Sequence, residues 1–87
     1  MKNNIEKSRY ELEMNGEVAY ADYKLDNNIL SIKYVFAPPA LRGTGAAGNL
    51  MKEIMDHARS ESLKVIPICG YAASWIKRHD EYADLVK

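Results

Sequence analysis

The sequence predicts a small α+β domain, with strands and helices in the order β-β-β-α-β-α around one mixed sheet. Three observations predict this class. Apolar and polar residues alternate in the first third of the chain, and residues 45–59 repeat apolar side chains at three- and four-residue steps. One short apolar stretch follows at 64–69. The 87 residues are enough for one modest core, so we expect residues 1–87 to form a single domain.

The first two strands are predicted on either side of Asn15-Gly16. This dipeptide is typical of a tight hairpin, because both residues tolerate the positive φ of a type I′ turn. Residues 9–14 alternate apolar and charged side chains, as a half-buried strand does. Residues 18–25 form the returning strand. Its alternation places three residues on one face: Ala19, Ala21 and Tyr23.

A second turn at Asp26-Asn27-Asn28 leads into a third strand, residues 29–36, which is rich in β-branched and aromatic residues. Strict alternation would place four residues on one side of this strand: Leu30, Ile32, Tyr34 and Phe36. Pro38-Pro39 ends the strand, because proline has no N–H to donate to a neighbour. The three strands should form an antiparallel meander.

A long amphipathic helix is predicted to begin near Gly45. Its apolar stripe must face the sheet, and it comprises Ala47, Leu50, Met51, Ile54, Met55 and Ala58. The opposite side carries charged residues, namely Lys52, Glu53, Asp56 and Arg59. We expect His57, between Asp56 and Ala58, to be solvated.

A fourth strand is predicted at 64–69, and a short helix at 72–79. Pro67 indicates a strand that lies at an edge or leaves its neighbour. A strand–helix–strand connection is almost always a right-handed crossover between parallel strands, so residues 29–36 and 64–69 should run parallel. Open sheets commonly bind ligands at the carboxyl ends of such strands.

The charge and cysteine content exclude several classes of protein. Twelve basic and twelve acidic residues balance, so the chain lacks the basic surface that nucleic-acid binding needs. No apolar run approaches the roughly 20 residues of a membrane span, and residues 1–6 show no hydrophobic leader. We therefore expect a cytoplasmic protein with no membrane or nucleic-acid partner. The single cysteine, Cys69, excludes an internal disulfide and a multi-cysteine zinc site, and no metal is expected. The oligomeric state stays open.

The glycine-rich loop at 41–50 has the character of an anion site. Glycines at a helix N-terminus allow close approach of a phosphate to free N–H groups, and the helix dipole and Arg42 add positive charge. Two named motifs fail here. The spacing Gly43-x-Gly45-x-x-Gly48 matches a dinucleotide fingerprint, but the following strand ends in Cys69-Gly70 instead of an acid, and the chain is too short for a doubly wound sheet. A P-loop would need Lys and Ser or Thr where Asn49 and Leu50 stand.

A third motif, Arg42-x-x-Gly45-x-Ala47, resembles the R/Q-x-x-G-x-G/A acyl-CoA signature of the GNAT acetyltransferase superfamily. The stretches at 39–45, 63–69 and 79–82 together resemble the minimal stand-alone GNAT-related proteins, which lack the usual first helices. Ala47 replaces the commoner glycine, which the pattern permits. The resemblance implies a GNAT-like fold in which the two parallel strands splay apart and hold CoA in the wedge.

The resemblance also implies the residues that bind acetyl-CoA or CoA. Pantetheine would bond the main chain of the first parallel strand at Val35, Phe36 and Ala37. The pyrophosphate would meet Arg42 and the backbone N–H groups of the loop: Gly43, Thr44, Gly45, Ala46 and Ala47. The implied activity is transfer of an acetyl group to an unidentified amine. The alternatives are a CoA-binding module without transferase activity and an interaction domain without a cofactor.

Residues outside the loop are further candidates for catalysis or binding. By resemblance, the Cys69 thiolate could carry the acetyl group covalently, and the alternative is a small packing residue. Direct transfer needs a general base, for which Glu13, Glu17 and Asp22 stay open. His79 is expected to be a helix-terminal cation, and the alternative is a catalytic base close enough to activate Cys69. Lys77 and Arg78 are expected to complement the helix dipole, with contact to the CoA 3′-phosphate as their alternative. Tyr71 and Trp75 are expected to pack, or to line the acyl end or the adenine.

Overall fold

The computed structural model describes residues 1–87 and contains five strands, two α-helices and three short 3₁₀ helices. The strands are β1 (Lys2–Asn4), β2 (Arg9–Met14), β3 (Glu17–Asp26), β4 (Ile29–Phe36) and β5 (Lys64–Pro67). The α-helices are α1 (Ala46–Ser60) and α2 (Gly70–Lys77), and the 3₁₀ helices are η1 (Ile5–Lys7), η2 (Pro39–Leu41) and η3 (Asp80–Leu85). Neither α-helix combines the length and the apolar character needed to cross a bilayer.

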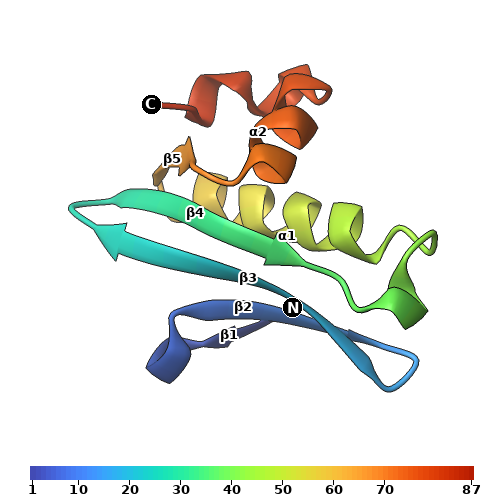
Figure 1. Cartoon of the computed structure of the whole chain (residues 1–87). Helices are drawn as coiled ribbons and strands as arrows, with labels where there is room; N and C mark the ends of the chain where they lie inside the picture. Colours follow the sequence, from blue (N-terminus) through green and yellow to red (C-terminus); the bar gives the residue numbers. More distant parts are fainter.

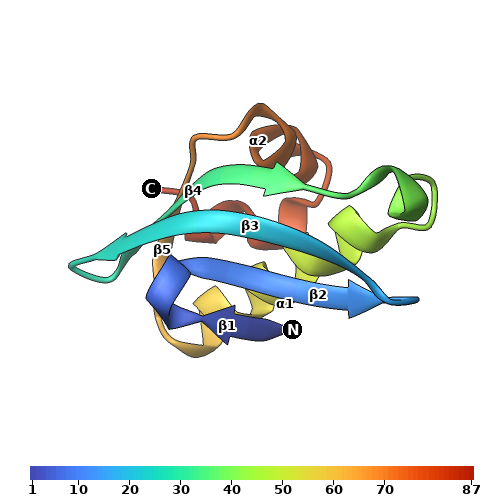
Figure 2. The same cartoon turned by 60° about the horizontal axis from the view of Figure 1, so that its bottom comes forward.

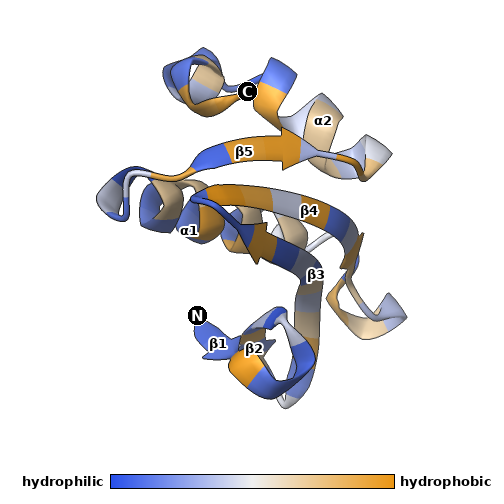
Figure 3. Ribbon diagram, turned by 90° about the vertical axis from the view of Figure 1, so that its left-hand side faces the viewer, coloured by the Kyte–Doolittle hydropathy of each residue, from blue (hydrophilic) through white to orange (hydrophobic).

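The five strands form one mixed sheet in sequence order, β1-β2-β3-β4-β5. The first four strands are antiparallel, and β5 runs parallel to β4 (Figure 1). The meander and the parallel pair predicted from the sequence are confirmed. Strand β1 was not predicted, because its three polar residues carry no alternating apolar signal (Figure 3).

Both turns of the meander are built from residues with positive φ. In the first turn φ is 54° at Asn15 and 78° at Gly16, and in the second it is 52° at Asn27 and 63° at Asn28. Asparagine and glycine tolerate this left-handed region better than other residues, which is why the sequence marks both turns.

Helix α1 lies behind the sheet, and α2 lies beside the edge of β4 (Figure 2). They enclose one core whose 20 buried residues are all hydrophobic. The stripe of α1 is confirmed from Leu50 onward, but its first member is the fully buried Ala46, whereas Ala47 is half-buried. Ala46 lies four residues before Leu50, so it shares the same side of the helix.

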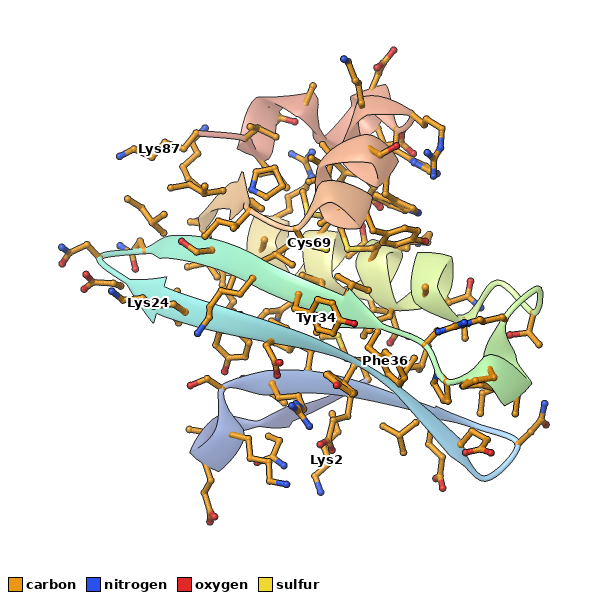
Figure 4. All side chains as sticks on the ribbon, in the orientation of Figure 1. Lys2, Lys24, Tyr34, Phe36, Cys69 and Lys87 are labelled. Carbon is orange, nitrogen blue, oxygen red and sulfur yellow. The ribbon has the colours of Figure 1, made fainter.

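A β-bulge in β4 overturns the predicted strict alternation of that strand. Tyr23 pairs with Ile32, but its neighbour Asp22 pairs with Tyr34, so Lys33 has no partner. An extra residue reverses the faces of all later side chains. Leu30 and Ile32 are buried under α1 as predicted, whereas Tyr34 is 50% exposed. Figure 4 shows Tyr34 on the open side of β4.

Two other details differ from the sequence-based expectation. The second helix spans Gly70–Lys77 instead of 72–79, because Cys69 is its N-cap and the preceding strand ends at Pro67. His57 is half-buried rather than solvated, since its ring packs edge-on against Tyr10, 5.8 Å between centroids. Its position lies close to the sheet because α1 crosses directly over β2 and β3.

Strand β5 lies at the end of the strand order, as Pro67 indicated. Its outer edge is partly covered by the end of the chain. Val86 forms a parallel bridge with Val65, and the Lys87 N–H donates to the Val65 carbonyl at 2.9 Å.

Candidate functional site

The parallel strands β4 and β5 separate after four residue pairs. Their ladder runs from Ile29 with Lys64 to Ile32 with Pro67. The N–H groups of Ile68 and Cys69 then both donate to the Ile32 carbonyl, at 3.0 Å each. Beyond this point β4 continues to Phe36 while the chain turns into α2. The edge of β4 at residues 33–36 therefore has no strand beside it, and an extended ligand can lie along it.

The loop that follows β4 presents free backbone donors at the start of α1. The N–H groups of Gly43, Gly45, Ala47 and Gly48 have no hydrogen-bond acceptor within the protein. Two others are used internally. Thr44 N–H donates to Leu41, and Ala46 N–H donates to the Thr44 hydroxyl at 3.3 Å. Of the predicted phosphate-binding N–H groups, those of Gly43, Gly45 and Ala47 are available.

Glycine at position 45 keeps this loop open to a ligand. Gly45 is the N-cap of α1 and has φ of 84°. A Cβ atom built on Gly45 or on Gly43 would meet no protein atom within 4 Å, so the space in front of both is free. Together with the dipole of a 15-residue helix, this arrangement suits an anion. We call residues 43–48, which are the end of the loop and the first residues of α1, the cradle.

Arg42 connects the cradle to the end of β4. Its Nε donates to the Ala37 carbonyl at 3.2 Å, and the rest of the guanidinium is exposed. This bond occupies the Ala37 carbonyl. Of the three residues predicted to bond pantetheine, Val35 and Phe36 are thus the two on the unpaired part of β4, whereas Ala37 lies beyond the strand.

A hollow of about 320 Å³ adjoins the cradle. Its lining combines glycines of α1 with aromatic and charged side chains: Gly45, Gly48, Asn49, Lys52, Trp75, His79, Glu81 and Tyr82. The rings of Trp75 and His79 stack, 3.7 Å between centroids and 11° between planes. The His79 Nδ1 lies 2.6 Å from the Trp75 carbonyl, so this nitrogen carries the proton in the bond between them.

The wall of this hollow is held by Tyr82. Its hydroxyl donates to Asp56 at 2.6 Å, and the carboxylate of Asp56 also binds Lys52 at 2.9 Å. These two hydrogen bonds, the one from Tyr82 first, lower the pKa of Asp56 below its usual value. The hydrogen bond from Tyr82 fixes η3 against α1, and the ion pair within α1 orients the Asp56 carboxylate that accepts it.

Sequence reasoning gave no site role to four lining residues, namely Asn49, Lys52, Glu81 and Tyr82. Lys52 is exposed, as predicted, and lines the hollow from the solvent side of α1. Positions 45, 48, 49 and 52 follow the spacing of one helix face, which is the signal that could have found Asn49 and Lys52. Lys77 and Arg78, considered for the 3′-phosphate, do not line the hollow.

Cys69 lies where the two parallel strands diverge. It is half-buried and packs against the core, and Figure 4 shows it between β4 and α2. His79 is at the other end of α2, about 12–15 Å away along a helix that rises 1.5 Å per residue. His79 is thus not placed to activate the thiol.

Tyr71 lies close to both Cys69 and the cradle. A Cβ on Gly48 would be 4.0 Å from the Tyr71 hydroxyl. Burial raises the pKa of Tyr71, and the neighbouring Cys69 adds to the increase. The phenol is therefore protonated at neutral pH and available as a hydrogen-bond donor.

The three carboxylates considered as general bases occupy different places. Asp22 is directly across from Tyr34 on β4, and Arg9 binds it at 2.7 Å. Glu13 lies on β2, paired with Val18, and Glu17 lies at the hairpin end of β3. Only Asp22 is next to the unpaired part of β4. The β-bulge places Asp22 opposite Tyr34, and the alternation of apolar and polar residues in the sequence does not reveal this bulge.

Comparison with known proteins agrees with this architecture. A family model described as GCN5-related N-acetyl-transferase matches residues 9–85. A similar solved structure is the NMR solution structure of a GCN5-like candidate N-acetyltransferase from Staphylococcus aureus, with 23% sequence identity and a TM-score of 0.64. The match covers 100% of this chain and 91% of the other. At this identity the likeness supports the fold.

Proposed function

This chain belongs to the GCN5-related N-acetyltransferase family, and on that premise we propose that it binds acetyl-CoA and transfers the acetyl group to an amine. The observation that carries the proposal is the combination of an unpaired strand edge with a cradle of free N–H groups at the end of that strand.

The residues present fit CoA in three respects. The cradle offers four free N–H groups and open space in front of Gly43 and Gly45, which suits a pyrophosphate. The edge of β4 at Val35 and Phe36 offers main-chain groups to an extended chain that contains amides. The hollow beside the cradle offers the His79 ring and the ammonium of Lys52 to the nucleotide end.

When bound, acetyl-CoA supplies an acetyl thioester as the acyl donor. The protein's own contribution is to bind and orient the two reactants at the divergence of β4 and β5. Asp22 would accept the proton that the attacking amine loses, because it is the carboxylate beside this point. The protonated phenol of Tyr71, on the α2 side of the β4 edge, would donate a proton to the leaving thiolate.

The test compares two glycine variants by calorimetric titration with acetyl-CoA. Gly45→Ala places a methyl group in the open space of the cradle. Gly16→Ala is a matched control, because Gly16 also has positive φ, 78° against 84°, and a methyl group there would likewise meet no protein atom within 4 Å. Both variants should lose about 1 kcal/mol of stability through backbone strain.

We expect Gly45→Ala to weaken acetyl-CoA binding at least tenfold and Gly16→Ala to leave it unchanged. Equal affinity in both variants would remove the cradle from the site. If the wild type binds acetyl-CoA but transfers its acetyl group to none of the amines offered, so that no free CoA thiol appears, a CoA-binding module is favoured over a transferase.

A further inference from the structure

A second hollow lies on the open face of the sheet, opposite the face that α1 covers. It measures about 730 Å³, within the range of small-molecule sites. Residues of three segments line it: Lys7, Ser8 and Arg9, then Asp22, Tyr23, Lys24 and Leu25 on β3, and Lys33 and Tyr34 on β4. We call it the open-face hollow.

Its wall is fixed by two hydrogen bonds that backbone N–H groups donate. The short helix η1 stands at one end of β1 and β2 (Figure 1). Asn4 caps η1 by accepting from the Lys7 N–H at 3.4 Å, and the Ser8 carbonyl accepts from the Tyr23 N–H at 2.9 Å. These bonds hold the start of β2 against β3, so the hollow exists without a ligand.

The charge of the open-face hollow is strongly positive. Its one carboxylate, Asp22, is already paired with Arg9 at 2.7 Å. The other three cations, Lys7, Lys24 and Lys33, take part in none of the four ion pairs of the structure. The chain as a whole has twelve basic and twelve acidic residues, so this excess is local. Three unpaired ammonium groups around one hollow attract an anion.

The open-face hollow also reaches the divergence of the parallel strands. Lys33 follows Ile32, whose carbonyl marks the point where β5 leaves β4. Tyr34, the next residue, lines the hollow and belongs to the unpaired edge. From the cradle, an extended donor running back along residues 33–36 covers about 13 Å and ends beside Lys33 and Tyr34.

From this placement we propose that the acceptor is a small amine that also carries an anionic group, a phosphate or a carboxylate. The lysines of the open-face hollow bind the anionic group, and the amine faces Asp22 and Tyr34. This inference rests on the proposed function, because the amine attacks an acetyl group that bound acetyl-CoA presents. The nitrogen–carbon bond forms as the carbon–sulfur bond breaks. Asp22 takes the proton that the neutral amine loses, and the Tyr71 phenol gives its proton to the leaving thiolate, so CoA leaves as the free thiol.

The test is an NMR titration of the full chain with backbone amides as probes. The ligands are 2-aminoethyl phosphate and β-alanine, which distinguish phosphate from carboxylate, and ethanolamine, which has an amine but no anionic group. The anionic amines should shift the amides of Ser8, Lys24 and Tyr34, with weaker binding at higher salt. Ethanolamine should not.

The variants separate specific binding from general charge. Lys24→Glu with Lys33→Glu should raise the dissociation constant of the anionic amine about tenfold, and the double Gln variant should raise it less. Lys87→Glu makes the same kind of charge change beside β5, outside the hollow, and should have no effect (Figure 4).

Equal shifts with ethanolamine, or unchanged binding in both double variants, would overturn the proposal. So would shifts of the same amides by an oligothymidylate alone, which would indicate a nucleic-acid surface. A separate titration with acetyl-CoA, read at Gly43 and Gly45, tests the proposed function by itself. If the anionic amines shift amides at the open-face hollow but acetyl-CoA shifts none at the cradle, the anion site is supported and the proposed transferase function is excluded.

Discussion

Asp22 of β3 lies directly across from Tyr34 of β4, although its neighbour Tyr23 is paired with Ile32. The extra residue, Lys33, lies between Ile32 and Tyr34, and it reverses the faces to which the later side chains of β4 point. Tyr34 and Phe36 therefore join Tyr20 on the open face, with ring centroids 5.3–6.5 Å apart. The bulge thus brings a carboxylate, an aromatic cluster and a free strand edge to one place.

Two substitutions in β4 test this reversal of faces. Ile32→Ala should lower the free energy of unfolding by about 2–5 kcal/mol, because Ile32 is fully buried under α1. Tyr34→Ala, two residues further, should cost less than about 1 kcal/mol because its ring is half exposed. Urea unfolding measures the free energy of unfolding of both variants. An equal loss of stability in the two would support an uninterrupted alternation along β4.

Asp22→Asn should reduce the acetyl-transfer rate without weakening acetyl-CoA binding. The amide keeps the size of the carboxylate but cannot accept the amine proton, and general-base catalysis commonly contributes about 10²–10⁴-fold. The measurement is release of CoA thiol with an amine that the wild type acetylates. Glu13→Gln is the control and should be unaffected. Comparable rates in Asp22→Asn and the wild type would exclude Asp22 as the base.

Cys69→Ser should retain CoA affinity and turn over like the wild type. The structure places no base beside the thiol, because His79 lies at the far end of α2 and binds Trp75. Transfer should then be direct, and incubation with acetyl-CoA alone should leave no acetyl thioester in the mass spectrum. A mass increase that hydroxylamine reverses, together with an inactive serine variant, would establish the covalent route instead.

Alkaline unfolding should depend on Tyr10. Burial raises the pKa of Tyr10 to about 12 in the folded protein, against 10.0 for an exposed tyrosine. Below pH 10 the phenol is neutral in both states, so its stabilising effect is complete. Between pH 10 and 12 only the unfolded chain ionises, and stability falls. Urea unfolding at these pH values should show that loss in the wild type and a smaller one in Tyr10→Phe.

The features that the sequence predicts are those whose cause lies in neighbouring residues. Asn15-Gly16 specifies its turn because few other residues tolerate positive φ. The stripe from Leu50 to Ala58 specifies a helix that must cover a sheet. Arg42, Gly45 and Ala47 mark the cradle, because a phosphate needs free N–H groups at a helix start and space that a side chain would fill. Each of these signals lies within a few residues of the structure it predicts.

Other features depend on contacts between distant segments, and only the tertiary structure decides them. Strand β1 is held by pairing with β2, and Lys33 is unpaired because β3 fixes the register on both sides of it. The open-face hollow is lined by Lys7, Lys24 and Lys33 from three segments, and the spacing of these lysines in the sequence does not predict that they lie together. A short-range pattern reports turns, helices and caps, because their energies are local. Register and surface charge arise from pairing across the sheet, so their physical cause is absent until the chain has folded.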